Sequence, residues 1–203
     1  MSTNKAKSSR KQEILQSLAH ELELNPGTRI TTASLAKAVG ISEAALYRHF
    51  PSKAKMFEGL IEFSEETIFG IINRIQSEQT GVESRCAAIL KLLLGFADRN
   101  PGITRILLGD ALVGEHERLR DRINQFYERL DTQVKQILRE GTMRGELPEA
   151  FPVNATANML LAVVEGRMNQ FSRSGFSKRP LEHWDQQWLL ISNQLFDSLV
   201  ETA

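Results

Sequence analysis

A dense group of polar donors lies in the stretch SEAALYRHFPSK, residues 42–53. Tyr47, Arg48 and His49 stand next to one another, and a lysine follows at position 53. Side chains of these types donate hydrogen bonds to phosphate oxygens and to the edges of bases. Ala44 and Ala45 come just before them, and such small residues let a helix enter the major groove of DNA. These residues therefore indicate contact with a nucleic acid.

A helix-turn-helix is predicted to position these side chains. The pattern gives a first helix at about 32–39, a turn at Gly40, and a second helix at about 43–50 that Ser42 caps and Pro51 ends. This is the spacing of DNA-binding helix pairs, although an αα corner with an incidental polar face has the same spacing. One side of the pair must be buried, and the apolar residues placed to do so are Leu35, Val39, Ile41, Leu46 and Phe50.

The charge of the chain is divided unevenly along the sequence. Residues 1–55 carry nine Lys and Arg against four Asp and Glu, a net +5, and residues 56–203 carry sixteen against twenty-one, a net −5. A basic first part on an acidic remainder indicates that the first part meets a polyanion. A solvated basic tail is the alternative, because residues 1–11 supply four of the nine positive charges. Thr31 and Thr32 start a helix, where free backbone N–H groups favour a phosphate.

The whole sequence predicts an all-α protein of about nine helices, because its apolar spacing is helical nearly throughout. Beyond the helix-turn-helix, helices are expected from about Ser9 to the NPG at 25–27, from Ser52 to about Ile75, and at about 82–99, 103–112, 115–140, 155–173 and 181–200. We expect three regions: a basic flexible tail at 1–9, the helix-turn-helix domain at 10–55, and a larger helical domain for dimerisation and partner binding at 56–203.

Nothing in the sequence predicts catalysis, a metal site or a cofactor. The single cysteine, Cys86, lies in an apolar helix, where a cysteine is usually a small buried residue. The four histidines are dispersed, and none stands with Cys, Asp or Glu at the spacing of a metal site. No Gly-rich phosphate loop or nucleophile elbow is present. No apolar run is long enough to span a bilayer, so we expect a cytoplasmic protein with no membrane partner.

A possible partner face is predicted on the 82–99 helix. In LLLGFADRNPG, residues 92–102, the core positions leave Leu92, Gly95, Arg99 and Asn100 on a neighbouring face at i, i+3, i+7 and i+8. A glycine there costs about 1 kcal/mol of helix propensity, which the close approach of a partner's backbone explains. Entry of a neighbouring helix explains it equally well. Phe63 lies beside the core stripe of the preceding helix and is expected to line the same groove.

The segment RITTASLAKAVGISEAALYRHFPSKAKMF, residues 29–57, resembles the DNA-binding head of the TetR family of bacterial transcription regulators. The resemblance implies a homodimer on roughly palindromic double-stranded DNA, and it leaves open more than one dimer per site. The DNA contacts that it implies are Thr31, Thr32, Glu43, Ala44, Ala45, Tyr47, Arg48, His49 and Lys53. It also implies that the last two helices pair with their copies, and the interface residues expected there are Leu160, Val164, Met168, Phe171, Trp184, Trp188, Ile191 and Leu195.

A narrower resemblance, to the nucleoid occlusion factors of this family, covers most of the first 112 residues. It is carried by the head, by EILQSLA at 13–19, and by LLLGFADRNPGITRILLGDAL at 92–112. It implies association with the nucleoid and, on DNA, antagonism of the division protein FtsZ as the partner. The residues that it assigns to this partner are Phe63, Leu92, Gly95, Arg99 and Asn100. The rival interpretation is a TetR-like repressor released by a small ligand that the helical body encloses.

Overall fold

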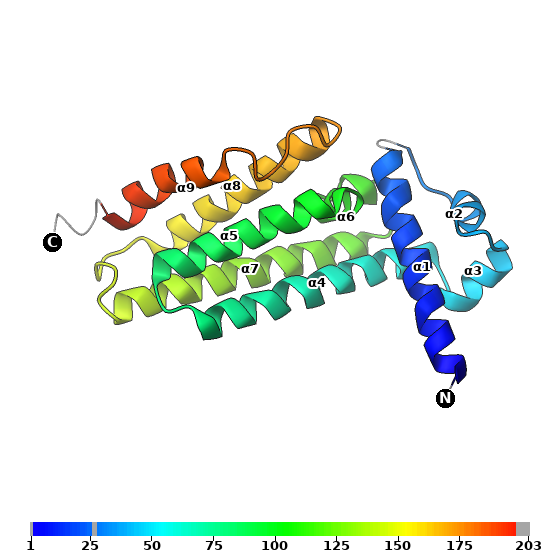
Figure 1. The fold of residues 1–203 in the computed structure, drawn as a ribbon, viewed down its shortest axis with the longest axis horizontal. Helices are drawn as coiled ribbons and strands as arrows, with labels where there is room; N and C mark the ends of the chain where they lie inside the picture. Colours follow the sequence, from blue (N-terminus) through cyan, green and yellow to red (C-terminus); the bar gives the residue numbers. More distant parts are fainter. Residues whose placement is uncertain (1, 26–27, 198–203) are drawn as a thin grey trace. The chain divides into compact units, whose positions relative to one another are not determined.

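The computed structural model describes residues 2–25 and 28–197, and in these ranges every long regular element is a helix, as predicted (Figure 1). The helices are α1 (Ser2–Leu24), α2 (Thr32–Val39), α3 (Glu43–His49), α4 (Lys53–Glu78), α5 (Val82–Arg99), α6 (Pro101–Leu107), α7 (Glu117–Met143), α8 (Val153–Arg173) and α9 (Trp184–Ser192). A 3-10 turn at Asp110–Leu112 and a π turn at Asn193–Asp197 complete the described elements. None of these helices combines the length and hydropathy that a membrane span needs.

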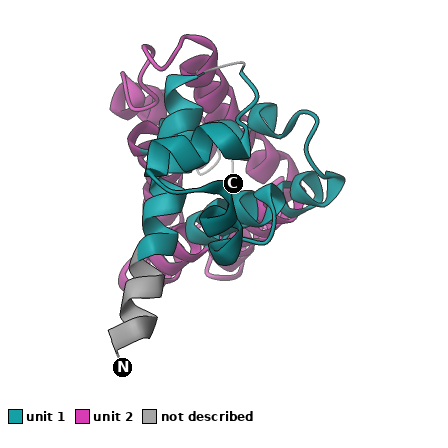
Figure 2. Ribbon diagram, turned by 90° about the vertical axis from the view of Figure 1, so that its right-hand side faces the viewer, with its two compact units in different colours: residues 1–65, 100–123 teal, residues 66–99, 124–203 magenta. Residues whose placement is uncertain are grey.

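The chain folds as two compact units, which Figure 2 colours separately. Unit 1 contains residues 1–65 and 100–123, and unit 2 contains residues 66–99 and 124–203. The helix-turn-helix therefore folds together with α6 and the start of α7, which follow it by about fifty residues. The boundary expected between residues 55 and 56 stays a prediction about function.

The first helix is longer than the sequence indicated. It begins at Ser2 and not near Ser9, so the backbone expected to form a flexible basic tail is helical. Residues 2–9 contain no proline or glycine and include alanine and lysine, which are good helix formers. Once Ile14 and Leu18 are buried and the helix has nucleated, each further residue of this kind adds to it at little cost.

The last helix is shorter than expected, since α9 begins at Trp184 and not near 181. The preceding connection is held by Arg167 of α8, whose Nε donates to the Pro180 carbonyl at 2.7 Å. Its guanidinium also donates to the Glu182 carbonyl, so a side chain takes the place of helical N–H donors. His183 has a φ of 59°, a left-handed conformation that interrupts a helix. The part of the prediction over 198–200 lies outside the described residues.

In unit 1 the amphipathic helix α1 lies against α2, α3 and α6. Its buried stripe is Ile14, Leu18 and Leu22, and the apolar residues that complete this core include Leu35, Leu46, Met56, Phe57, Leu60, Ile61, Ile103, Ile106 and Leu107. The approach of α1 to α6 is very close, because a Cβ atom added at Gly102 would lie 1.9 Å from the Ala19 carbonyl oxygen. Only glycine fits at this crossing.

Unit 2 contains the second half of α4 with α5, α8, α9 and most of α7. The rings of Phe69 and Phe126 meet edge to face with centroids 5.6 Å apart, and α5 lies along α8. The buried Arg85 donates to Glu140 at 2.7 Å, and this bond holds the pKa of that carboxyl below its usual range. Burial raises the pKa of the Cys86 thiol to about 12, so this group stays protonated at neutral pH.

We expect Gly102→Ala to lower the free energy of unfolding by about 2–3 kcal/mol, because the new methyl group overlaps a backbone carbonyl that cannot move aside. The matched control is Gly70→Ala on the exposed face of α4, where no atom lies within 4 Å of the added Cβ. That change should raise stability by up to about 1 kcal/mol through helix propensity. Urea denaturation followed by circular dichroism measures both, and equal stability of the two variants contradicts the close-approach argument.

Candidate nucleic-acid interface and dimer surface

The first helix of the pair has well-formed ends. Thr31 is its N-cap: its hydroxyl accepts the Ser34 N–H at 3.0 Å, and the Ser34 hydroxyl accepts the Thr31 N–H at 3.2 Å. This reciprocal arrangement is a capping box. Gly40 ends the helix with a φ of 73°, which a glycine adopts without strain. The turn predicted at this glycine is confirmed, and the exposed Thr31 hydroxyl already has a local partner.

The second helix, α3, is also fixed at both ends. The Ser42 hydroxyl accepts the Ala45 N–H at 3.2 Å, which confirms Ser42 as its N-cap. Leu46 and Phe50 are buried and anchor the helix to unit 1, while α4 starts three residues after Phe50 with Ser52 accepting the Lys55 N–H. Such short, capped elements leave the exposed face of α3 little freedom to reorient.

A chain of side-chain hydrogen bonds joins α2 to α3. The Thr32 hydroxyl donates to the Glu43 carboxylate at 2.8 Å, and the Tyr47 hydroxyl lies 3.4 Å from Thr32 Oγ1. Three predicted DNA contacts are therefore brought together in one polar cluster, although 15 residues separate the first from the last. Glu43 accepts the Thr32 hydroxyl in this cluster, and its assignment as a DNA contact stays a prediction.

Burial varies over the rest of the predicted DNA face. Ala44 and Arg48 are exposed, Ala45 is half-buried, and Tyr47 presents almost half of its surface. His49 is half-buried, and its Nδ1 atom is buried without a hydrogen-bond partner among the described residues. Its Nε2 atom is consequently the one that can reach a phosphate. The assignment of all these residues to DNA stays a prediction.

Lys53 has a partner that no spacing rule in the sequence reveals. Its ammonium donates to Oε1 of Glu115 at 2.6 Å, 62 residues away along the chain. The Nε atom of Arg29 lies 3.7 Å from the same carboxylate oxygen. Lys53 is one of the predicted DNA contacts. Its positive charge is thus already neutralised by Glu115, an acid of the same unit.

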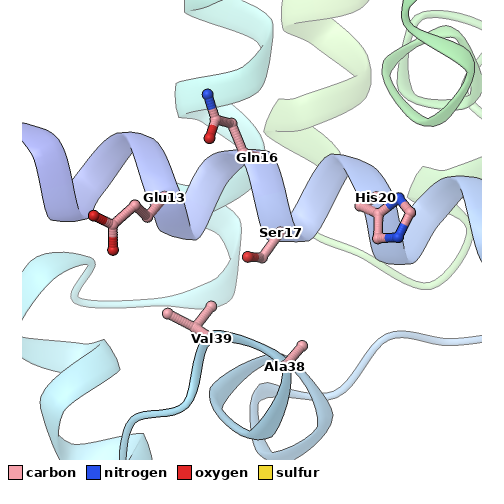
Figure 3. A pocket seen from close by; sticks show the side chains of 6 residues that line it. All are labelled: Glu13, Gln16, Ser17, His20, Ala38 and Val39. Atoms are coloured by element: carbon pink, nitrogen blue, oxygen red, sulfur yellow. The ribbon is translucent and has the colours of Figure 1, made fainter.

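A shallow groove separates α1 from the C-terminal end of α2, as Figure 3 shows. Glu13, Ser17 and His20 line it from α1, and Ala38 and Val39 line it from α2. None of the predicted DNA contacts lies in this groove. It marks where α2 separates from α1, and it is not part of the candidate interface.

The residues predicted to bind a protein partner fall in both units. In unit 1, Phe63 is almost half exposed, and Asn100 precedes α6. In unit 2, Arg99 is exposed, Leu92 is half-buried and Gly95 is buried. A Cβ at Gly95 would lie 3.7 Å from Arg99 Nη1 and 3.7 Å from Leu181 Cδ1, which is ordinary contact. Leu181, from the α8–α9 connection, is a neighbour of this face that the sequence did not indicate.

The predicted dimer interface needs correction. Leu160, Val164, Met168, Phe171 and Trp184 are at most 3% exposed, so their own chain already covers them. These helices also contribute apolar side chains to the core of their own protomer. One apolar stripe of α8 packs there, where α5 lies along it. Trp188, Ile191 and Leu195 are half-buried and can still contribute. The large apolar side chains that α8 and α9 expose are Met159, Leu189 and Leu190.

Comparisons with known proteins agree with this architecture. Residues 15–60 match the family model described as bacterial regulatory proteins, tetR family, and residues 79–196 match a tetracyclin repressor-like C-terminal domain of the SlmA-like type. Among solved structures, the MbdR regulator of Azoarcus sp. has a TM-score of 0.77 at 16% identity, covering 92% of this chain and 97% of that one. A TetR regulator of Haloarcula marismortui has a TM-score of 0.76 at 20% identity, covering 95% and 98%. At such low sequence identity, these two structures support the fold alone.

The chain therefore belongs to the TetR family of bacterial regulatory proteins, which bind DNA, form dimers and are not enzymes. Within this family, several curated relatives are named nucleoid occlusion factor SlmA. The nucleoid occlusion factor SlmA of Shewanella amazonensis is 56% identical over 198 residues, which is 96% of this chain and 98% of that protein. The SlmA of Alteromonas mediterranea is 57% identical over 182 residues, covering 90% and 93%.

We expect Arg48→Gln to weaken binding to a DNA duplex selected in vitro by the protein at least tenfold. If Arg48 contacts a phosphate, its loss also reduces the slope of log K against log salt by about 1 per protomer. If it contacts a base, its loss reduces affinity for the selected duplex only. Lys37→Gln, on the exposed end of α2, removes the same charge outside the predicted face and serves as control. Fluorescence anisotropy measures both, and equal effects remove Arg48 from the interface.

We expect Leu190→Glu to convert the dimer to a monomer, because this side chain is 71% exposed on α9 and a charge there cannot be buried in an apolar interface. The control is Met143→Glu, an exposed apolar residue of the same unit at the end of α7. Sedimentation equilibrium gives the mass of each variant, and thermal melting checks that each is folded. A Leu190→Glu protein that stays dimeric places the interface elsewhere.

Proposed function

We propose that the protein is a nucleoid occlusion factor: a homodimer that binds specific chromosomal sites and, while on DNA, binds FtsZ and antagonises its assembly. The observation that carries the proposal is the identity of about 55% over nearly the whole chain with relatives named nucleoid occlusion factor SlmA. Identity of this extent includes the helical body, where TetR-like proteins differ most. It follows that the protein acts in the cytoplasm, on the nucleoid.

The helix-turn-helix supports the DNA-binding part of the proposal. Arg48, Tyr47 and the Thr32 hydroxyl stand on the exposed side of a pair of capped helices, with two alanines at the start of α3 to allow entry into the groove. The remaining predicted contacts, Thr31, His49 and Lys53, suit the phosphates on either side. Two such heads on one twofold axis match a palindromic site.

The exposed end of α5 supports the partner-binding part. The exposed Arg99 offers five N–H donors, and the half-buried Leu92 offers an apolar side chain on the same face. Gly95 lies between them without a side chain, and the nearest atoms to a Cβ built there belong to the side chains of Arg99 and Leu181. If these two side chains move apart, an extended peptide can approach the helix backbone closely. An acidic or carboxylate-bearing segment of the partner suits the guanidinium.

Ion pairs keep the α8–α9 connection next to this face. Lys91 of α5 lies 2.8 Å from Asp185, and Arg179 donates to Asp98 through its guanidinium. The Arg179–Asp98 pair joins α5 to the connection that carries Leu181, and the exposed Lys91–Asp185 pair joins α5 to α9. The first pair therefore places this connection beside α5.

The test is capture of purified FtsZ, and separately of its C-terminal tail peptide, on the immobilised protein with and without the selected duplex. We expect capture that the duplex strengthens, and at least a tenfold loss in Arg99→Glu with DNA binding unchanged. Arg139→Glu, at an exposed position of α7 in the same unit, is the matched control.

Each outcome separates the candidates. Capture lost in both charge variants assigns the effect to net charge, and Arg99 then has no special place in the interface. No capture in either state, together with intact DNA binding, contradicts nucleoid occlusion and leaves a repressor that a small ligand releases. A ligand screen by thermal shift then becomes the informative measurement.

A further inference from the structure

Glu115 occupies an unusual position for an acidic residue of a DNA-binding head. Its carboxylate lies 2.6 Å from the Lys53 ammonium, and its side chain is only 9% exposed. The Lys53 side chain is 18% exposed, with its ammonium 5.4 Å from the centre of the Phe57 ring. An ion pair that is largely removed from water is stronger and less screened by salt than an exposed one.

We propose that Glu115 competes with DNA phosphate for Lys53 and thereby limits the affinity of the protein for DNA. The proposal rests on the phosphate contact proposed for Lys53. When the Lys53 ammonium turns from Glu115 to a phosphate, the Lys53–Glu115 pair opens, and the free energy of that pair is subtracted from binding in each protomer. A dimer opens two such pairs, and the effect on its affinity is squared.

Arg29 makes this exchange possible without leaving a buried charge unpaired. Its Nε atom already lies 3.7 Å from the same Glu115 oxygen, while its side chain is 73% exposed and free to move. When Lys53 turns to a phosphate, Arg29 can close on the carboxylate in its place. Opening a buried pair with no such substitute would be far more costly.

The structure also leaves room for the movement. A cavity of about 160 Å³ lies beside the pair, and its lining includes Lys53, Arg29, Glu115 and Phe57. The four-carbon stem of a lysine can rotate its ammonium within such a space. Glu115 by contrast follows a segment whose backbone is held in place.

The backbone that carries Glu115 is fixed to α1. The buried Arg105 donates to the Leu22 carbonyl at 2.7 Å and to Asp110 at 2.9 Å. The Glu115 N–H itself donates to the Leu112 carbonyl at 3.1 Å. The turn therefore presents the carboxylate at a fixed position. A group that competes for Lys53 needs such a position, and an acid on a solvated surface lacks it.

The test is the affinity of Glu115→Gln for the selected duplex and for an unrelated duplex over a series of salt concentrations. We expect affinity to rise at least about threefold per protomer, or roughly tenfold for the dimer, for both duplexes. Glu117→Gln, two residues along at an exposed position, removes the same charge without an ion pair to Lys53 and should change affinity less than about twofold.

A double-mutant cycle with Lys53→Met shows whether the effect passes through the lysine. Lys53→Met alone should weaken binding and lower the salt slope by about 1 per protomer, and adding Glu115→Gln should then change affinity less than about twofold, as Glu117→Gln does. Weaker binding by Glu115→Gln, an effect equal to that of Glu117→Gln, or the same gain in the Lys53→Met background overturns the proposal. Lys53→Met without effect overturns instead the phosphate contact on which it rests.

Glu115→Asp keeps the test decisive if Glu115→Gln does not fold. The shorter side chain retains the charge but withdraws the carboxylate from the ammonium. We expect a gain in affinity in the same direction and smaller in size, with thermal melting as the check on folding. Unchanged or weaker binding by this variant contradicts competition at Lys53.

Discussion

The close approach of α1 to α6 is the constraint on which unit 1 depends. The Ala19 carbonyl lies where a side chain at position 102 would have to be, so the two helices meet backbone to backbone. This contact brings residues 100–123 into the same compact unit as the helix-turn-helix. Arg105 then joins the end of α6 to the last carbonyls of α1. The turn that carries Glu115 is placed beside Lys53 as a result.

Polar donors are consequently arranged at two depths in the DNA-binding head. Arg48 and Tyr47 stand at its surface, while Lys53 lies deeper, against an acid of the same unit. Affinity for DNA is then a balance between an external and an internal anion. A limit of this kind lowers non-specific binding to phosphate along with specific binding.

The sequence predicts those features whose signals are local. The ends of α2 and α3 follow from Thr31, Gly40 and Ser42, each of which acts within three residues of its own position. It does not predict the partner of Lys53, because 62 residues and a tertiary contact separate that lysine from Glu115.

The dimer surface shows a different limit. Apolar spacing identifies the stripes of α8 and α9 correctly, but it does not say which stripe the protomer covers with its own helices. Leu160 and Val164 of α8 are core residues of the protomer, whereas Leu189 and Leu190 of α9 are exposed. Periodicity alone cannot separate two apolar roles on one helix.

The α8–α9 connection has a consequence for how such chains can diverge. Arg167 holds it through the carbonyl groups of residues 180 and 182, and every amino acid supplies a carbonyl. Substitutions in this segment are therefore tolerable at positions whose side chains make no contact of their own. The exceptions are the buried Pro180, the left-handed His183, Arg179 with its Asp98 pair, and Leu181 beside Gly95. An insertion or deletion is a different matter, since it moves Leu181 along α5 and away from Gly95. Related chains should accordingly vary here in composition while keeping the same number of residues.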